Sequence, residues 1–255
     1  MTGGDQFPSR NFSIGLCSTF FFMKTVVLLP SLGRPASDFD VLCEALQVAG
    51  FNTLALDPPH SLPGEPTLHD LAEYVITSID TAQIGSFHLV GHAFGNRLAR
   101  MVTTDYSDRV KTLTLLAAGG YVEMQRDIFQ SLIACYDETL SDEMHMHHVS
   151  RAFFAEGNDP TVWREGWMPD VMRLQQAALS RVDRTEWWDA VAPRVLVVQA
   201  LQDVIAPLGN GQKYASDHPS ITTLVDIDGA GHAMLPEQPE AISTALISFL
   251  TQSAK

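Results

Sequence analysis

The ten residues FHLVGHAFGN, 87–96, decide the fold. A strand is predicted over Phe87–Val90 and a helix over Phe94–Thr104, so Gly91-His92-Ala93-Phe94-Gly95 forms the turn between them. Its spacing matches G-x-S-x-G, a sharp strand-to-helix turn whose central serine is a nucleophile. The small residues let the strand and helix approach, and the helix N-terminus points free N–H groups at the turn. Here the central residue is alanine, Ala93.

Strand and helix patterns alternate on both sides of this turn. Short apolar runs predict further strands over Thr25–Leu29, Asn52–Leu56, Lys111–Ala117, Arg194–Ala200 and Thr222–Ile227. Helices are predicted after the cap residues Ser37 and Thr67, and over Pro239–Thr251. Strands that alternate with helices predict an α/β protein with a mostly parallel, doubly wound sheet.

One block interrupts the alternation. Between Tyr121 and Ala192 the pattern is helical, with four tryptophans and no good buried strand. We therefore predict an inserted helical cap over residues 121–192, lying above the edge of the sheet where ligands bind in open α/β folds. The core would comprise residues 23–120 and 193–255, and residues 1–22 would be an N-terminal extension.

Two polar residues follow the last two predicted strands. Asp203 lies after Arg194–Ala200, and His232 lies after Thr222–Ile227. Because the carboxyl ends of parallel strands share one edge of the sheet, both side chains are expected to meet the turn at Ala93. The order of turn, aspartate and histidine is that of a Ser-Asp-His triad built on such a sheet.

On these motifs the chain resembles the α/β-hydrolase superfamily from about Met23 to its C-terminus. Leu28-Leu29-Pro30-Ser31-Leu32-Gly33 is similar to the loop of 3-oxoadipate enol-lactonases and related small lactonases and esterases. The resemblance implies an oxyanion hole made by the backbone N–H groups of Leu32 and Phe94, with Ser31 as a further polar contact. It also implies that the helical block is a cap domain and that the chain is an enzyme.

Ala93 departs from the family pattern, because a methyl group can neither attack a carbonyl nor give a proton to His232. Three accounts stay open. In the first, alanine is natural, and His232 with Asp203 acts as a base on water or on an acidic substrate. The resemblance supports this account, because it includes cofactor-free enzymes of the dioxygenase or lyase type that use such a pair as base. In the second, Ala93 is an engineered replacement of serine in an esterase or lactonase. In the third, the protein binds a ligand without turning it over. The expected substrate is a small, partly apolar ester, lactone or ketone.

Composition narrows the class of partner. The net charge of −14 argues against nucleic acid and anionic membranes, and no apolar run reaches the roughly 18 residues of a membrane span. Cys17, Cys43 and Cys135 are scattered without a CxxC pair, which favours reduced thiols and a cytoplasmic location. No dinucleotide or P-loop motif is present, so no cofactor is expected. The sequence leaves a homodimer open.

Two features of the helical block are weaker signals. Trp167 and Met168 are candidates to roof the pocket, since ligand pockets are mainly apolar. His145, His147 and His148 form a cluster, but a zinc site would need further ligands from elsewhere, so no metal is expected.

Overall fold

The computed structural model describes residues 24–252, and the predicted N-terminal extension lies outside them. Six parallel strands form one sheet in the order β2-β1-β3-β4-β5-β6. The strands are β1 (Thr25–Leu29), β2 (Asn52–Ala55), β3 (Phe87–His92), β4 (Val110–Leu116), β5 (Val195–Ala200) and β6 (Thr222–Ile227). The chain runs outward from β1 to β2 and returns to β3, so the strand order reverses between β1 and β3. Ligands bind at such a reversal, outside the carboxyl ends of the strands.

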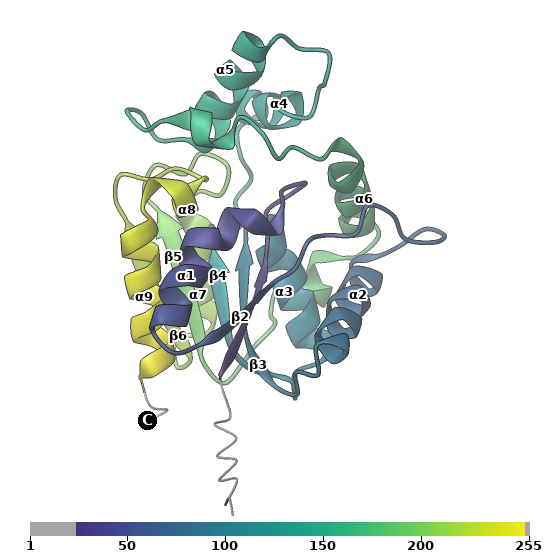
Figure 1. Ribbon diagram of the computed structural model, residues 1–255, viewed down its shortest axis with the longest axis vertical. Helices are drawn as coiled ribbons and strands as arrows, with labels where there is room; N and C mark the ends of the chain where they lie inside the picture. Colours follow the sequence, from purple (N-terminus) through teal and green to yellow (C-terminus); the bar gives the residue numbers. More distant parts are fainter. Residues whose placement is uncertain (1–23, 253–255) are drawn as a thin grey trace, which may run out of the picture.

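Helices cover both faces of this sheet, which confirms the predicted doubly wound α/β fold (Figure 1). The α-helices are α1 (Asp40–Val48), α2 (Leu68–Thr81), α3 (Phe94–Asp105), α4 (Arg126–Ala134), α5 (Asp142–Phe153), α6 (Pro169–Ser180), α7 (Gly209–Asp217), α8 (Met234–Glu237) and α9 (Pro239–Thr251). Short 3₁₀ turns are η1 (Ala36–Phe39), η2 (Pro160–Trp163) and η3 (Arg184–Glu186). One core cluster joins α2 and α3 to the sheet, and a second joins α1 and α9 to its opposite face.

Local sequence signals predicted most of the helix and strand boundaries. The capping box of α2 is present: Thr67 N–H donates to Asp70 Oδ2 at 2.7 Å, and Asp70 N–H donates to the Thr67 hydroxyl. Ser37, however, lies inside η1, and α1 begins three residues later at Asp40. Helix α7 has no signal in its sequence GNGQKYASD; it forms where Tyr214 is fully buried in the core.

The inserted segment 121–192 contains α4, α5 and α6. Figure 1 shows α4 and α5 beyond the carboxyl ends of the strands, whereas α6 lies beside α2. The segment therefore covers one end of the sheet and also reaches down one side. Its role as a substrate cap stays a prediction. None of the helices within residues 24–252 has the length and apolarity that a bilayer crossing needs.

Candidate active site

Ala93 occupies the turn between β3 and α3 in a strained backbone conformation. Its φ is +52° and its ψ is −108°, values that a residue with a side chain rarely adopts. Such a residue costs about 1–3 kcal/mol and persists only where its surroundings impose it. Both flanking positions, 91 and 95, require glycine because the backbone passes close to them. A Cβ on Gly95 would overlap the carbonyl oxygen of Leu29, and one on Gly91 would overlap the backbone of Gly95. The turn keeps the geometry of a nucleophile elbow and carries a methyl group at its tip.

The substitution Gly95→Ala is expected to destabilise the fold by at least about 2–3 kcal/mol, since the overlap is with backbone that cannot rotate away. Urea unfolding measures this change. Gly85→Ala is the matched control, because a Cβ there meets nothing within 4 Å. Equal stability of the two variants would contradict the close approach of α3 to β1.

Asp203 and His232 form a buried hydrogen-bonded pair. Asp203 follows β5 and His232 follows β6, and Asp203 Oδ2 lies 2.8 Å from His232 Nδ1. Burial by itself would raise the pKa of Asp203, but His232 and two backbone hydrogen bonds outweigh burial and hold that pKa below its ordinary value. Those backbone donors are the N–H groups of Ile205, at 2.8 Å, and Ala206, at 2.7 Å. The carboxylate therefore stays ionised and keeps the proton of the imidazole on Nδ1, which leaves Nε2 free to act as a base.

His92 supports this pair from the other side. It is fully buried, and its Nε2 lies 2.9 Å from the carbonyl oxygen of His232, which can only accept a hydrogen bond. Burial first, and then the neighbouring imidazole of His232, lower the pKa of His92 to about 3. His92 is therefore neutral and holds the backbone of His232 in place.

A second support that the sequence did not reveal is Glu237 of α8. Its carboxylate accepts hydrogen bonds from the N–H groups of Gly231 (2.8 Å) and Ala155 (2.7 Å) and from the Asn158 amide (2.6 Å). Gly231 immediately precedes His232, whereas Ala155 and Asn158 belong to the inserted segment. Glu237 thus fastens the histidine loop to that segment.

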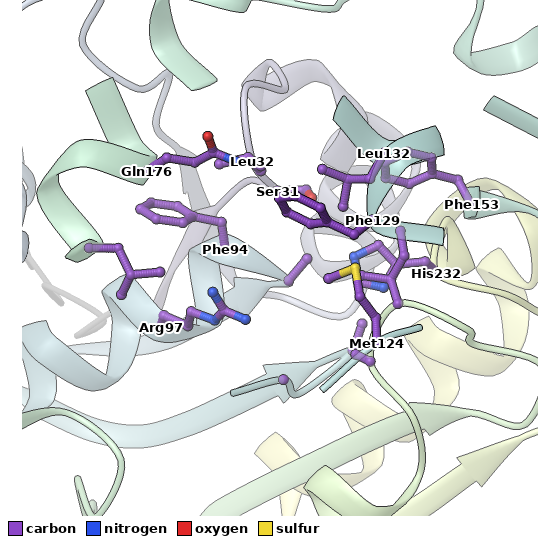
Figure 2. A pocket seen from close by; sticks show the side chains of 16 residues that line it. Ser31, Leu32, Phe94, Arg97, Met124, Phe129, Leu132, Phe153, Gln176 and His232 are labelled. Carbon is purple, nitrogen blue, oxygen red and sulfur yellow. The ribbon is translucent and has the colours of Figure 1, made fainter. Parts of the chain in front are cut away.

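A cavity of about 120 Å³ lies over the elbow (Figure 2). It contains Ala93 and His232, together with Ser31, Leu32 and Phe94. The rest of its lining is mainly apolar and comprises Arg97, Ala117, Gly119, Met124, Phe129, Leu132, Phe153, Gln176, Leu179, Ile205 and Ala206. No hydrogen bond between residues of the described range engages the N–H group of Leu32 or Phe94. The structure thus brings five sequence-predicted site residues around one cavity, with Asp203 directly behind His232.

Trp167 and Met168 do not line this cavity. The Trp167 ring packs against Phe153 at 5.1 Å, and the Arg34 guanidinium lies 4.6 Å from its centre. Met168 directly precedes α6 and donates its N–H to the Gly33 carbonyl oxygen at 3.0 Å. Both residues hold the loop after β1 from outside, and the apolar roof comes instead from α4, α5 and α6.

The loop after β1 is fastened to the inserted segment at several points. The Tyr136 hydroxyl donates to the Leu32 carbonyl oxygen, and Gly33 N–H donates to Gln175 Oε1 at 2.7 Å. Arg34 donates to the Glu165 carbonyl oxygen at 2.8 Å, and its guanidinium lies 4.4 Å from the centre of the Trp163 ring. The position of the Leu32 N–H group therefore depends on residues 136–175, a dependence that no local pattern in the sequence indicates.

The histidine cluster on α5 lies apart from the cavity. His145 packs edge-on against Trp167 at 5.7 Å, and His148 Nδ1 lies 3.2 Å from the Ser131 hydroxyl. Across residues 24–252, no three His, Cys, Asp or Glu side chains are grouped so that they could hold a metal ion.

A parallel α/β sheet with an elbow after its third strand, and with a buried Asp–His pair after its last two, defines the class of α/β-hydrolase-fold enzymes. The chain belongs to the Alpha/beta hydrolase family, whose sequence profile it matches over residues 26–245. It is an enzyme of that superfamily, as its fold and its hydrolase-named relatives agree.

Individual relatives are distant. The putative carbamate hydrolase RutD of Caulobacter sp. (strain K31) is 23% identical over 236 residues, which cover 88% of this chain and 85% of the relative. The hydrolase of Pseudomonas aeruginosa PA01 has a TM-score of 0.75 at 21% identity, covering 90% of this chain and 91% of that one. The enol-lactonase of Burkholderia xenovorans LB400 has a TM-score of 0.74 at 19% identity, covering 90% and 92%. These structural likenesses establish the fold.

Proposed function

We propose that this chain hydrolyses a small carbonyl compound by direct attack of water, without a covalent intermediate on the enzyme. The observation that carries the proposal is the 2.8 Å bond between Asp203 and His232, kept beside an elbow that has no hydroxyl. A positioned base needs no serine to deprotonate water. Ala93 leaves open the space of the missing oxygen, where a water molecule can lie next to His232.

The reaction runs in two proton transfers. His232 Nε2 takes a proton from water while the water oxygen bonds to the carbonyl carbon. The carbonyl electron pair moves onto its oxygen, and the N–H groups of Leu32 and Phe94 stabilise the resulting oxyanion. When the intermediate collapses, the imidazolium of His232 returns the proton to the leaving group. Asp203 keeps the ring oriented and compensates its positive charge throughout.

The substrate class is an ester, a lactone or a carbamate. The mainly apolar cavity of about 120 Å³ admits a small acyl group, since an apolar cavity of roughly 150 Å³ holds benzene. Carbamates are included in this class because the Caulobacter relative is named a putative carbamate hydrolase. Lactones are included because the Burkholderia neighbour is named an enol-lactonase. We also place this activity in the cytoplasm, because Cys43 and Cys135 are free thiols. A homodimer stays a prediction.

A second candidate is a serine esterase or lactonase in which alanine has replaced the nucleophile. The observation that favours it is the φ of +52° at Ala93, because direct attack of water does not need a strained residue there.

The proposal predicts turnover without an acyl-enzyme. Carbamates, lactones and p-nitrophenyl esters are incubated with the protein in H₂¹⁸O, and products and intact protein mass are measured together. We expect ¹⁸O in the acid product of at least one class and no mass added to the protein at any time. A covalent adduct, or no turnover of any of the three classes, would contradict direct hydrolysis.

A further inference from the structure

Arg97 is a cation without a partner inside the cavity. It extends from α3 on the same side as Phe94, and its guanidinium points toward the middle of the cavity in Figure 2. No hydrogen bond or ion pair joins its side chain to any residue in the range 24–252. Its guanidinium lies 5.9 Å from the centre of the Trp187 ring. A half-buried guanidinium of this kind has its five donors free.

Some arginines within the described residues pair with an acid. Arg34, Arg109, Arg151 and Arg164 each contact a carboxylate, and only Arg34 of these four is fully buried. Arg100 does not: it is fully buried without a hydrogen-bond partner, but it packs on the Trp188 and Tyr214 rings and does not line the cavity. Arg97 makes no contact with a carboxylate although it is less exposed than Arg151 and Arg164. Burial lowers the pKa of Arg97, and no carboxylate within residues 24–252 forms an ion pair with it. An unpaired charge in such a site is costly unless something else pairs with it.

The way into the cavity carries the same sign of charge. An outer cleft shares Arg97, Met124, Phe129, Leu179 and Ile205 with the cavity, so the two are continuous. Arg126 and Arg184 also line this cleft, against a single acid, Glu123. The whole chain has 16 basic and 30 acidic residues. A basic cleft on so acidic a protein favours the entry of anions.

The positions of Ala93 and Arg97 limit the length of the ligand. Ala93 directly precedes α3, Arg97 lies in its first turn, and both line the same cavity of about 120 Å³. A carbonyl group placed above Ala93 and a group bound by Arg97 are therefore separated by a few bonds. Guanidinium binds carboxylate through two parallel hydrogen bonds, a geometry that Arg offers and Lys does not.

We propose that Arg97 binds a carboxylate of the substrate, and that the substrate is an acyl compound with this carboxylate a few carbons from the reacting carbonyl. This rests on the proposed function for the identity of the reacting group, but not for the anion site itself. The outer cleft attracts the anion, Arg97 neutralises it, and the carbonyl end reaches His232. Arg97 thereby selects acidic over neutral substrates.

Binding of glutarate tests the site without any chemistry, because its two carboxylates resemble a product acid that keeps its remote carboxylate. Isothermal titration compares glutarate with glutaramide, its neutral diamide. We expect the wild-type protein to bind glutarate at least tenfold more tightly than glutaramide. Arg97→Gln should weaken glutarate binding about 10- to 100-fold, the range for hydrogen bonds to a charged group, and leave glutaramide unchanged.

Two further variants make the test specific. Arg173→Gln removes the same charge from an exposed position on α6 outside the cavity, and it should bind glutarate as the wild type does. Arg97→Lys keeps the charge and should recover only part of the affinity. Equal binding of the two ligands, no glutarate binding at all, or an equal loss in Arg97→Gln and Arg173→Gln would overturn the proposal.

The result is separable from the test of hydrolysis. His232→Gln should still prefer glutarate over glutaramide, since the anion site does not use the imidazole as a base. If the panel of carbonyl substrates shows no turnover while Arg97-dependent glutarate binding persists, direct hydrolysis fails and the carboxylate site stands. Inorganic phosphate is the remaining probe, and Arg97-dependent binding of phosphate as tight as that of glutarate would overturn the choice of carboxylate.

Discussion

Replacement of His232 by glutamine is expected to lower turnover of the best substrate by about 10²–10⁴-fold, the range that general acid–base catalysis contributes. Glutamine approximates the size of the ring but has no group that accepts and returns a proton near neutral pH. Asp203 then keeps its two backbone hydrogen bonds and loses only the imidazole. Steady-state kinetics measure the effect, which should fall on kcat more than on KM.

A histidine outside the cavity provides the control. His147 is exposed on α5, so His147→Gln should retain wild-type kinetics. Circular dichroism and thermal unfolding establish that both variants fold. Wild-type kcat in a folded His232→Gln protein would remove His232 from the mechanism, and with it the proposed function.

Replacement of Ala93 by serine is expected to create a covalent route. The serine hydroxyl would occupy the tip of the elbow, beside the base that Asp203 already orients. A complete triad contributes about 10⁶-fold to kcat, so even partial alignment should raise hydrolysis of p-nitrophenyl esters more than tenfold. The same variant should react with a fluorophosphonate at Ser in position 93, which intact mass and peptide mapping detect.

Ala117→Ser separates a placed nucleophile from any added hydroxyl. Ala117 lines the same cavity just after β4, the strand next to β3, but it is not at the tip of the elbow, so this variant should neither gain turnover nor be labelled. Absence of both labelling and gain in Ala93→Ser would show that the elbow no longer presents its side chain to His232. That outcome would also remove the serine-hydrolase candidate.

The elbow and the Asp–His pair could be predicted from the sequence because their signals are local. Glycines on either side of Ala93 are forced by backbone contact, so the motif survives even without its hydroxyl. Asp203 and His232 are 29 positions apart, but parallel strands deliver both to one edge. The prediction of a mostly parallel sheet was enough to place both side chains at one edge.

The inserted segment could not be predicted at the same level. Trp167 is an aromatic residue in the predicted cap, but its ring packs against the Arg34 guanidinium on the outside of the loop after β1. Which face of an inserted helix points into the cavity depends on contacts with residues far away in the sequence. The apolar character of a residue does not by itself decide this orientation. Arg97 was equally hidden, because a basic residue within a helix resembles a solvated one until the residues around it are known.

The fastening of the loop after β1 limits how a molecule can reach Ala93. An outward movement of residues 136–175 would break their hydrogen bonds to Leu32, Gly33 and Arg34. It would also displace the Leu32 N–H group that is proposed to stabilise the oxyanion. Passage past Met124 and Phe129, two of the side chains shared by the cavity and the outer cleft, breaks none of these hydrogen bonds. Through this side entrance, substrate can enter and product can leave while the N–H groups of Leu32 and Phe94 stay in position between turnovers.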